Sequence, residues 1–142
     1  MRHRKKVKKL SRTPAHRKAM LRNLLTSFFD NEQVITTKAK AKVAQRKAEK
    51  LISHSISGTL QDKRAIISYL QNREVAHKLI KLGEEIFSKA PAGGHTAIYK
   101  YGFRKGDGAE LVVLDLITEK KEKKKKKKKP SKEKVIQACL LY

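Results

Sequence analysis

Apolar residues recur every three or four positions from about residue 14 to residue 87, the period expected of helices with one buried face. The first such stretch runs from Pro14 to about Phe29. Thr13 is a favourable start for it, because its hydroxyl can accept an N–H from the first turn and proline is tolerated at the first helical position. The polar run at 30–32 is predicted to end this helix.

A strand and a long helix are predicted next. Gln33–Thr37 is short, β-branched and alternating, as strands are. Thr36 or Thr37 caps a helix that continues to about Ser57, and Gly58 is typical of a helix end. Basic residues are expected on its exposed surface. The residues expected to face inward are Ala44, Ala48, Leu51, Ile52 and Ile56.

Two shorter helices, at 62–70 and at 73–87 with Asn72 as its cap, complete the helical half. The period then changes: 96–101 and 110–117 are predicted to be strands joined by a glycine-rich hairpin loop at 102–108. Because the first strand needs partners, we expect an α+β fold. Its two layers would be about four helices packed on a small three-stranded sheet.

Positive charge is concentrated at the two ends of the chain. The net charge is +23, of which residues 1–22 carry +10 and residues 120–134 carry +9. The 97 residues between them hold 15 basic and 11 acidic residues. We therefore predict a basic arm at 1–13, a globular domain at 14–118 and a lysine-rich extension at 119–142. So large an excess of positive charge requires a polyanion as partner. Nucleic acid is the first candidate and an anionic membrane the second.

The lysine-rich extension contains seven consecutive lysines, 123–129, and should not fold until they are neutralised. Its final eight residues, 135–142, are apolar enough for a docking peptide, although a disordered end without a defined role is the favoured interpretation. The lone Cys139 allows no internal disulfide, which indicates a reducing cytoplasm. The basic first ten residues lack the apolar stretch of a signal peptide, and no run in the chain approaches the ~20 apolar residues of a membrane span.

Catalytic patterns are absent from the sequence. The five histidines have no zinc-ligand spacing, and the glycines of the 102–108 loop join two strands and precede no helix, unlike a phosphate-binding loop. The sequence therefore predicts no enzyme, metal, cofactor or small-molecule substrate. A DNA-binding architectural protein is an alternative, although no helix-turn-helix, zinc finger or heptad seam is found. A membrane-surface protein would explain the extension but not residues 1–118.

Several motifs resemble the seventeenth large-subunit ribosomal protein family of bacteria. They are Met-Arg-His-Arg-Lys at 1–5, His-Arg-Lys-Ala-Met at 16–20, Thr-Thr at 36–37, Glu-Lys-Leu-Ile at 49–52 and Gly-Phe-Arg at 102–104. The resemblance covers residues 1 to about 118 and implies a cytoplasmic ribosomal protein. It would bind large-subunit rRNA and neighbouring ribosomal proteins near the peptide exit region, with its N-terminal segment threaded into RNA. The lysine-rich extension departs from the family pattern, so nothing of the family is transferred to it.

Arginines are the expected anchors, because a guanidinium can clamp a phosphate at two points and stack on a base, whereas lysines act as point charges. We expect about half of the long helix's cations, Lys38, Lys40, Lys42, Arg46 and Lys47, to touch RNA. Tyr99 or Tyr101 is expected to pack into the core. The predicted RNA-binding residues are Arg2, His3, Arg4, Lys5, Lys6, Lys8, Lys9, Arg12, His16, Arg17, Lys18, Arg22, Lys38, Lys40, Arg104 and Lys105.

Overall fold

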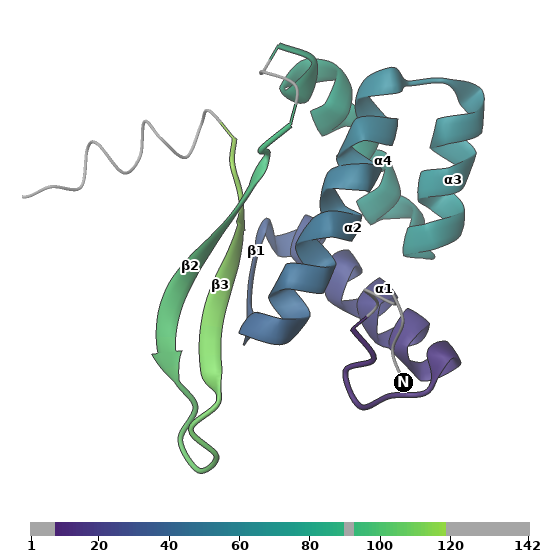
Figure 1. Ribbon diagram of the computed structural model, residues 1–142. Helices are drawn as coiled ribbons and strands as arrows, with labels where there is room; N and C mark the ends of the chain where they lie inside the picture. Colours follow the sequence, from purple (N-terminus) through teal and green to yellow (C-terminus); the bar gives the residue numbers. More distant parts are fainter. Residues whose placement is uncertain (1–7, 90–92, 119–142) are drawn as a thin grey trace, which may run out of the picture.

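The computed structural model describes residues 8–89 and 93–118, which form four helices packed on a three-stranded antiparallel sheet (Figure 1). The predicted α+β fold class is therefore confirmed. A short 3-10 helix follows the fourth helix. The elements are α1 (Pro14–Asn31), β1 (Gln33–Thr37), α2 (Lys38–Ser57), α3 (Leu60–Leu70), α4 (Arg73–Glu85), η1 (Phe87–Lys89), β2 (Thr96–Phe103) and β3 (Glu110–Leu116).

Side-chain capping explains where the two shorter helices begin. The Thr59 hydroxyl accepts the Asp62 N–H at 3.2 Å, so α3 begins two residues earlier than predicted. Asn72 caps α4 as predicted, accepting the Glu74 N–H at 3.0 Å. The expected hydroxyl cap at Thr13 is wrong: Thr13 holds the cap position of α1, but only its backbone carbonyl accepts a bond there, from the Arg17 N–H at 2.9 Å.

The central strand of the sheet is β3, because the strand order is β1-β3-β2. The register places Ile35 of β1 opposite Val113 and Ile98 of β2 opposite Leu114. Strand β2 extends beyond the predicted end to Phe103, with a bulge between Lys100 and Gly102. Alternate residues of β3 thus face the helices, and the others face the opposite side of the sheet.

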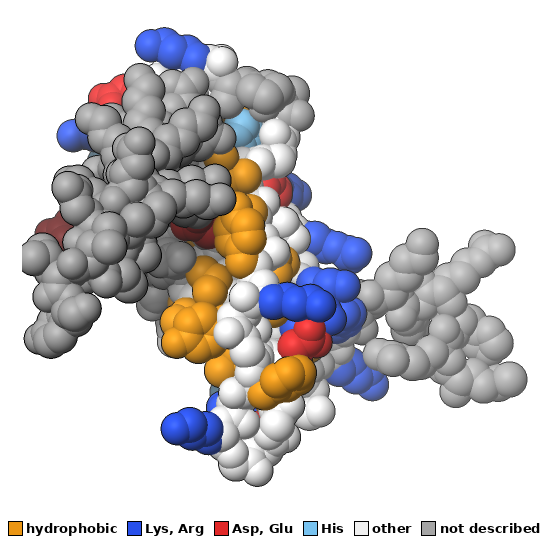
Figure 2. Space-filling view, turned by 90° about the vertical axis from the view of Figure 1, so that its left-hand side faces the viewer, with side chains coloured by type: hydrophobic (Ala, Val, Ile, Leu, Met, Phe, Trp, Pro, Cys, Tyr) orange, Lys and Arg blue, Asp and Glu red, His pale blue; other side chains and the backbone are white. Residues whose placement is uncertain are grey.

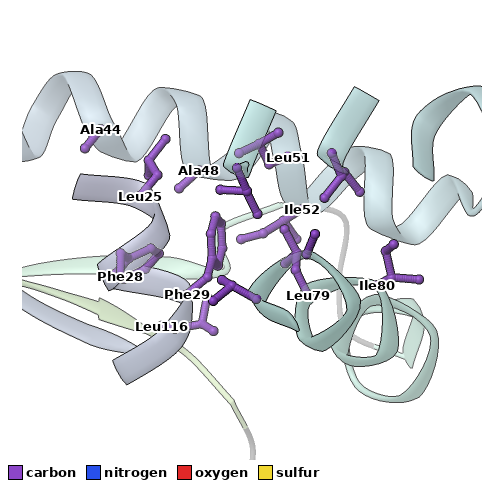
Figure 3. Close-up of a cluster of buried hydrophobic side chains, with 14 of the residues drawn as sticks. Leu25, Phe28, Phe29, Ala44, Ala48, Leu51, Ile52, Leu79, Ile80 and Leu116 are labelled. Carbon is purple, nitrogen blue, oxygen red and sulfur yellow. The ribbon is translucent and has the colours of Figure 1, made fainter. Parts of the chain in front are cut away.

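A single hydrophobic core lies between the helices and the sheet (Figure 3). Phe28 and Phe29 of α1 are fully buried and their rings lie 5.1 Å apart. Leu116 of β3 and Leu79 of α4 join the same cluster. Because these side chains come from two helices and the central strand, this cluster fixes the position of the helices on the sheet. Several small residues of α2 lie in it or beside it.

Helix α2 crosses α4 so closely that no side chain fits at Gly83. A Cβ built at this glycine would lie 2.6 Å from the Ser55 backbone oxygen and Cβ. Ser55 is buried, and its hydroxyl donates to the Ile52 carbonyl at 2.7 Å. Ser55 thus takes the inward position at the last turn of α2. The prediction that Ile56 faces inward is wrong for this reason, and Ile56 is 36% exposed.

The sheet face away from the helices carries a band of exposed apolar side chains (Figure 2). Tyr99 pairs with Val113 on this face and is 48% exposed, while its neighbour Ile98 packs toward the core. Tyr101, beside the bulge, is 62% exposed. The prediction that one of these tyrosines packs into the core is therefore wrong, because the helices cover only one side of the sheet.

We expect Gly83→Ala to lower the free energy of unfolding by about 1 to 3 kcal/mol, as overpacked cores do. The added methyl group meets backbone atoms of Ser55, which cannot rotate away. Urea denaturation measures the change. The control is Lys81→Ala, at an exposed position of the same helix, and it should change the free energy of unfolding by no more than about 0.5 kcal/mol. If Gly83→Ala instead stabilised the protein by about 1 kcal/mol, as the higher helix propensity of alanine predicts at an open position, that result would contradict the close crossing of α2 and α4.

Thr59→Ala should destabilise the protein by about 1 kcal/mol, the usual effect of losing a cap. Thr13→Ala is the matched control and should have a smaller effect, because that hydroxyl makes no cap hydrogen bond. The Thr59 hydroxyl also donates to Asp62 and lowers the pKa of that carboxyl. This stabilisation is present above the ordinary pKa of Asp62 and is lost as the pH falls through the lowered value. Equal effects of the two substitutions in thermal unfolding would refute the capping role.

Candidate nucleic-acid interface

The segment before α1 turns back beside that helix (Figure 1). The Arg12 N–H donates to the Lys9 carbonyl at 3.3 Å, and the intervening Leu10 and Ser11 both have left-handed backbone angles, φ 56° and 51°. The Arg17 guanidinium donates to the same carbonyl at 3.4 Å. These bonds hold the end of the basic arm against the start of α1.

Two residues predicted as separate RNA contacts form a pair. The Arg12 guanidinium lies 2.8 Å from Nε2 of His16, one helical turn away. Because a guanidinium only donates, the imidazole nitrogen is the acceptor here. Arg12 and His16 therefore present their polar groups together. Lys18, next along α1, is exposed.

A groove of about 480 Å³ lies between the arm, α1 and α2. We call it the basic groove, since five of its seven lining residues are cations. Three different chain segments supply them, so folding brings together charges that are far apart in the sequence. The lining residues are Lys8, Arg17, Leu21, Lys42, Val43, Arg46 and Lys47.

A second groove of about 510 Å³ lies between α2 and the sheet, and we call it the sheet-side groove. Lys42 and Arg46 line both grooves, because they lie one turn apart on α2. They form a ridge between the two grooves. The sheet-side groove is lined by Lys38, Lys42, Gln45, Arg46, Ile98, Lys100, Glu110 and Val112.

Lys38 is paired with a carboxylate from the sheet. Its ammonium donates to both oxygens of Glu110, at 2.8 and 2.9 Å. This hydrogen bond is the main reason that the pKa of Glu110 lies below its ordinary value, and Lys100 and Lys42 lower it further. Lys38 therefore brings little uncompensated charge. Lys40 is half-buried and lines neither groove.

The tip of the β2–β3 hairpin is closed by an ion pair. The Arg104 Nε–H donates to Asp107 Oδ1 at 2.9 Å, and a second contact joins Nη2 to the other oxygen. The guanidinium holds the pKa of the Asp107 carboxyl far below its usual range. This pairing agrees with an ordinary polar turn, and the predicted RNA contact of Arg104 stays a prediction. Lys105 is exposed beside it.

Arg22 takes part in a contact that the sequence did not indicate. Its guanidinium lies over the Tyr69 ring of α3, 5.7 Å from the centroid. Tyr69 is half-buried, and burial raises the pKa of its hydroxyl. A small hollow of about 170 Å³ beside this ring is lined in part by Lys47 and Lys50. Basic residues thus continue from the basic groove toward α3.

Lys9 is exposed at the turn before α1. The predicted contacts Arg2, His3, Arg4, Lys5 and Lys6 lie outside the described residues. Lys42 and Arg46 follow Lys38 at one-turn intervals on α2, so helical spacing could have nominated them together with Lys38. Nothing in the sequence indicated that Tyr69 would meet Arg22, because the two residues lie on different helices.

Neither a cluster of three metal ligands nor a helix able to span a membrane is formed by the residues that the structure describes. Within 8–89 and 93–118 no three histidine, cysteine or carboxylate side chains gather as metal ligands. No helix in those ranges is long and apolar enough to cross a membrane. A further hollow of about 790 Å³ lies between α1 and the α3–α4 turn, where Arg73 and Glu74 are its only charged lining residues.

Comparison with known proteins found a matching family. The family model described as "Ribosomal protein L17" matches residues 20–117. A protein of Geobacter metallireducens named "Large ribosomal subunit protein bL17" is 42% identical over 136 residues, covering 96% of this chain and 76% of the relative. Proteins of the same name from Desulfotalea psychrophila and Gemmatimonas aurantiaca are 42% and 44% identical over 117 residues. Each match covers 82% of this chain, with 90% and 98% of the respective relative.

Replacing Lys38 by glutamine should raise the pKa of Glu110 toward its ordinary value of 4.5. The pair stabilises the protein above that ordinary pKa, and its contribution disappears as the pH falls through the lowered pKa. Carboxyl carbon shifts followed by NMR during a pH titration measure the effect. Lys40→Gln is the matched control and should leave the Glu110 titration almost unchanged. An unchanged curve in Lys38→Gln would argue against the ion pair.

Proposed function

Because the chain belongs to the ribosomal protein L17 family, we propose that it is a structural constituent of the large ribosomal subunit that binds rRNA. Its relatives are named as large-subunit proteins, which supports a role in the ribosome and in translation. We infer that this role is structural, with no catalytic step, metal or cofactor. The bacterial relatives support a cytoplasmic location, on ribosomes.

The convergence of cations on the basic groove is the observation that carries the proposal. Five basic side chains from the arm, α1 and α2 line one hollow, and the described residues place no carboxylate in it. A surface of this kind attracts closely spaced phosphates and releases their counterions, so binding depends strongly on salt. Folded rRNA provides such phosphates on several sides of a groove.

We propose three roles for the three parts of the chain. The arm at 1–13 extends along rRNA beyond the groove. The globular domain at 14–118 positions the arm, and the extension at 119–142 adds positive charge. Neighbouring ribosomal proteins are the expected protein partners, and the peptide exit region is the expected location. The composition of the arm supports its role, because residues 1–13 contain seven basic residues and no acidic one.

Sucrose-gradient fractionation of a lysate containing the tagged full chain tests the proposal. Co-migration with the large subunit that survives high salt is expected for a protein integrated into folded rRNA. Release to the top of the gradient by moderate salt, or migration with free DNA or membranes, would contradict it. Such a result would describe a general polyanion binder.

The double variant Lys42→Gln with Arg46→Gln should weaken binding of the full chain to large-subunit rRNA and flatten its salt dependence. Each lost phosphate contact should reduce the slope of log affinity against log salt by about 0.7 to 0.9. Filter binding at several salt concentrations measures the slope. The control Lys81→Gln with Lys89→Gln removes the same charge from positions outside both grooves. An equal change in both variants would mean that only net charge matters.

A further inference from the structure

The floor of the basic groove is apolar although its rim is cationic. Leu21 of α1 is only 6% exposed and Val43 of α2 is half-buried, and both line the groove between the basic side chains. A phosphate group alone would meet the cations but would leave this floor in contact with water. Covering apolar surface is favourable only for a group that is itself weakly hydrated. The preferred occupant therefore combines a planar or apolar group with negative charge.

We propose that the basic groove receives one unstacked nucleotide of rRNA, its base lying on Leu21 and Val43 and its flanking phosphates meeting the surrounding cations. The inference rests on the proposed function and names the RNA feature that this site takes. Unpaired bases in loops and bulges are the parts of RNA that proteins recognise most specifically, since a splayed base can lie on a protein surface. Duplex RNA has no such base to offer.

The dimensions and the distribution of charge agree with this occupant. The groove measures about 480 Å³, within the ~300 to 1,000 Å³ typical of pockets for small molecules. Lys8 and Arg17 stand on one side, and Lys42, Arg46 and Lys47 stand on α2. A nucleotide within a strand has a phosphate before and after its base, so cations on both sides complement it.

The neighbouring grooves are less suitable. The sheet-side groove also has apolar lining, from Ile98 and Val112, but it contains the Glu110 carboxylate. The lowered pKa of Glu110 keeps this group ionised, and a negative charge repels phosphate. The hollow beside Tyr69 measures only about 170 Å³. Of the three hollows compared, the basic groove is the one that combines size, an apolar floor and uncompensated cations.

The turn at Leu10 and Ser11 holds one wall of the groove in place. Two successive left-handed residues redirect the chain there, and Lys8 lines the groove together with residues of α2. The Lys9 carbonyl accepts bonds from Arg12 and Arg17, which fix this turn to α1. Because this side of the groove is already fixed before binding, the protein loses less conformational entropy when the nucleotide enters.

The test uses the full chain and two RNA hairpins that carry 2-aminopurine at the same position. In one hairpin the 2-aminopurine is a single-nucleotide bulge, and in the other it is paired within the stem. We expect tighter binding of the bulged hairpin, on the order of fivefold, the low end of base-stacking effects. The 2-aminopurine fluorescence should rise on binding, since the base leaves its stacked neighbours for an aliphatic surface.

Val43→Asn should abolish the preference for the bulge and the rise in fluorescence while keeping the affinity for the paired hairpin. Val34→Asn is the matched control, because Val34 is also half-buried against the core but lines neither groove. Circular dichroism checks that both variants fold. The milder Val43→Thr replaces Val43→Asn if the latter unfolds, and it should reduce the preference.

Equal, salt-sensitive binding of both wild-type hairpins would overturn the nucleotide site while leaving the proposed rRNA binding intact. Absence of salt-sensitive binding to either hairpin or to large-subunit rRNA would instead contradict the proposed function. A preference that appears only after deletion of residues 2–7 would mean that the arm itself fills the groove. That result too would overturn the inference.

Discussion

The small, buried face of α2 is the constraint on which the rest of the structure depends. Ala41, Ala44 and Ala48 are fully buried, and α2 packs against the other three helices and all three strands. Small side chains permit this close packing on several sides. The opposite face of α2 is then left to lysine and arginine, held at one-turn intervals by a rigid helix. The same helix thus fixes both the core and the spacing of the charged groups.

Acidic residues limit which cations are available for binding. Glu110 neutralises Lys38, Asp107 neutralises Arg104, and Glu84 pairs with Lys63 at 2.9 Å. These exposed pairs contribute little stability individually, but each reduces the positive charge around it. The basic groove is distinguished by lacking such partners among the described residues. Charge is therefore organised as much by where the carboxylates lie as by where the lysines lie.

The sequence predicted the elements well because their periods are local properties. Asn72 and Gly58 marked helix ends through chemistry that acts within one turn. The orientation of Tyr99 was not predictable in the same way, since alternation defines two faces of a strand but not which of them the helices cover. The Lys38–Glu110 pair joins residues 72 positions apart, and only the folded sheet brings them together. Local pattern therefore gave the elements and the general location of the charge, whereas the groove required tertiary structure.

The strand order has a consequence for how the chain acquires its structure during synthesis. Strand β1 pairs only with β3, so residues 33–37 find their partners at residues 111–115. All four helices are synthesised before β3, and β1 must remain unpaired throughout that interval. Contacts between such distant segments form slowly, because a long loop has to close first. The sheet is therefore completed last, and a nascent chain that stops before residue 110 presents an open strand to other chains.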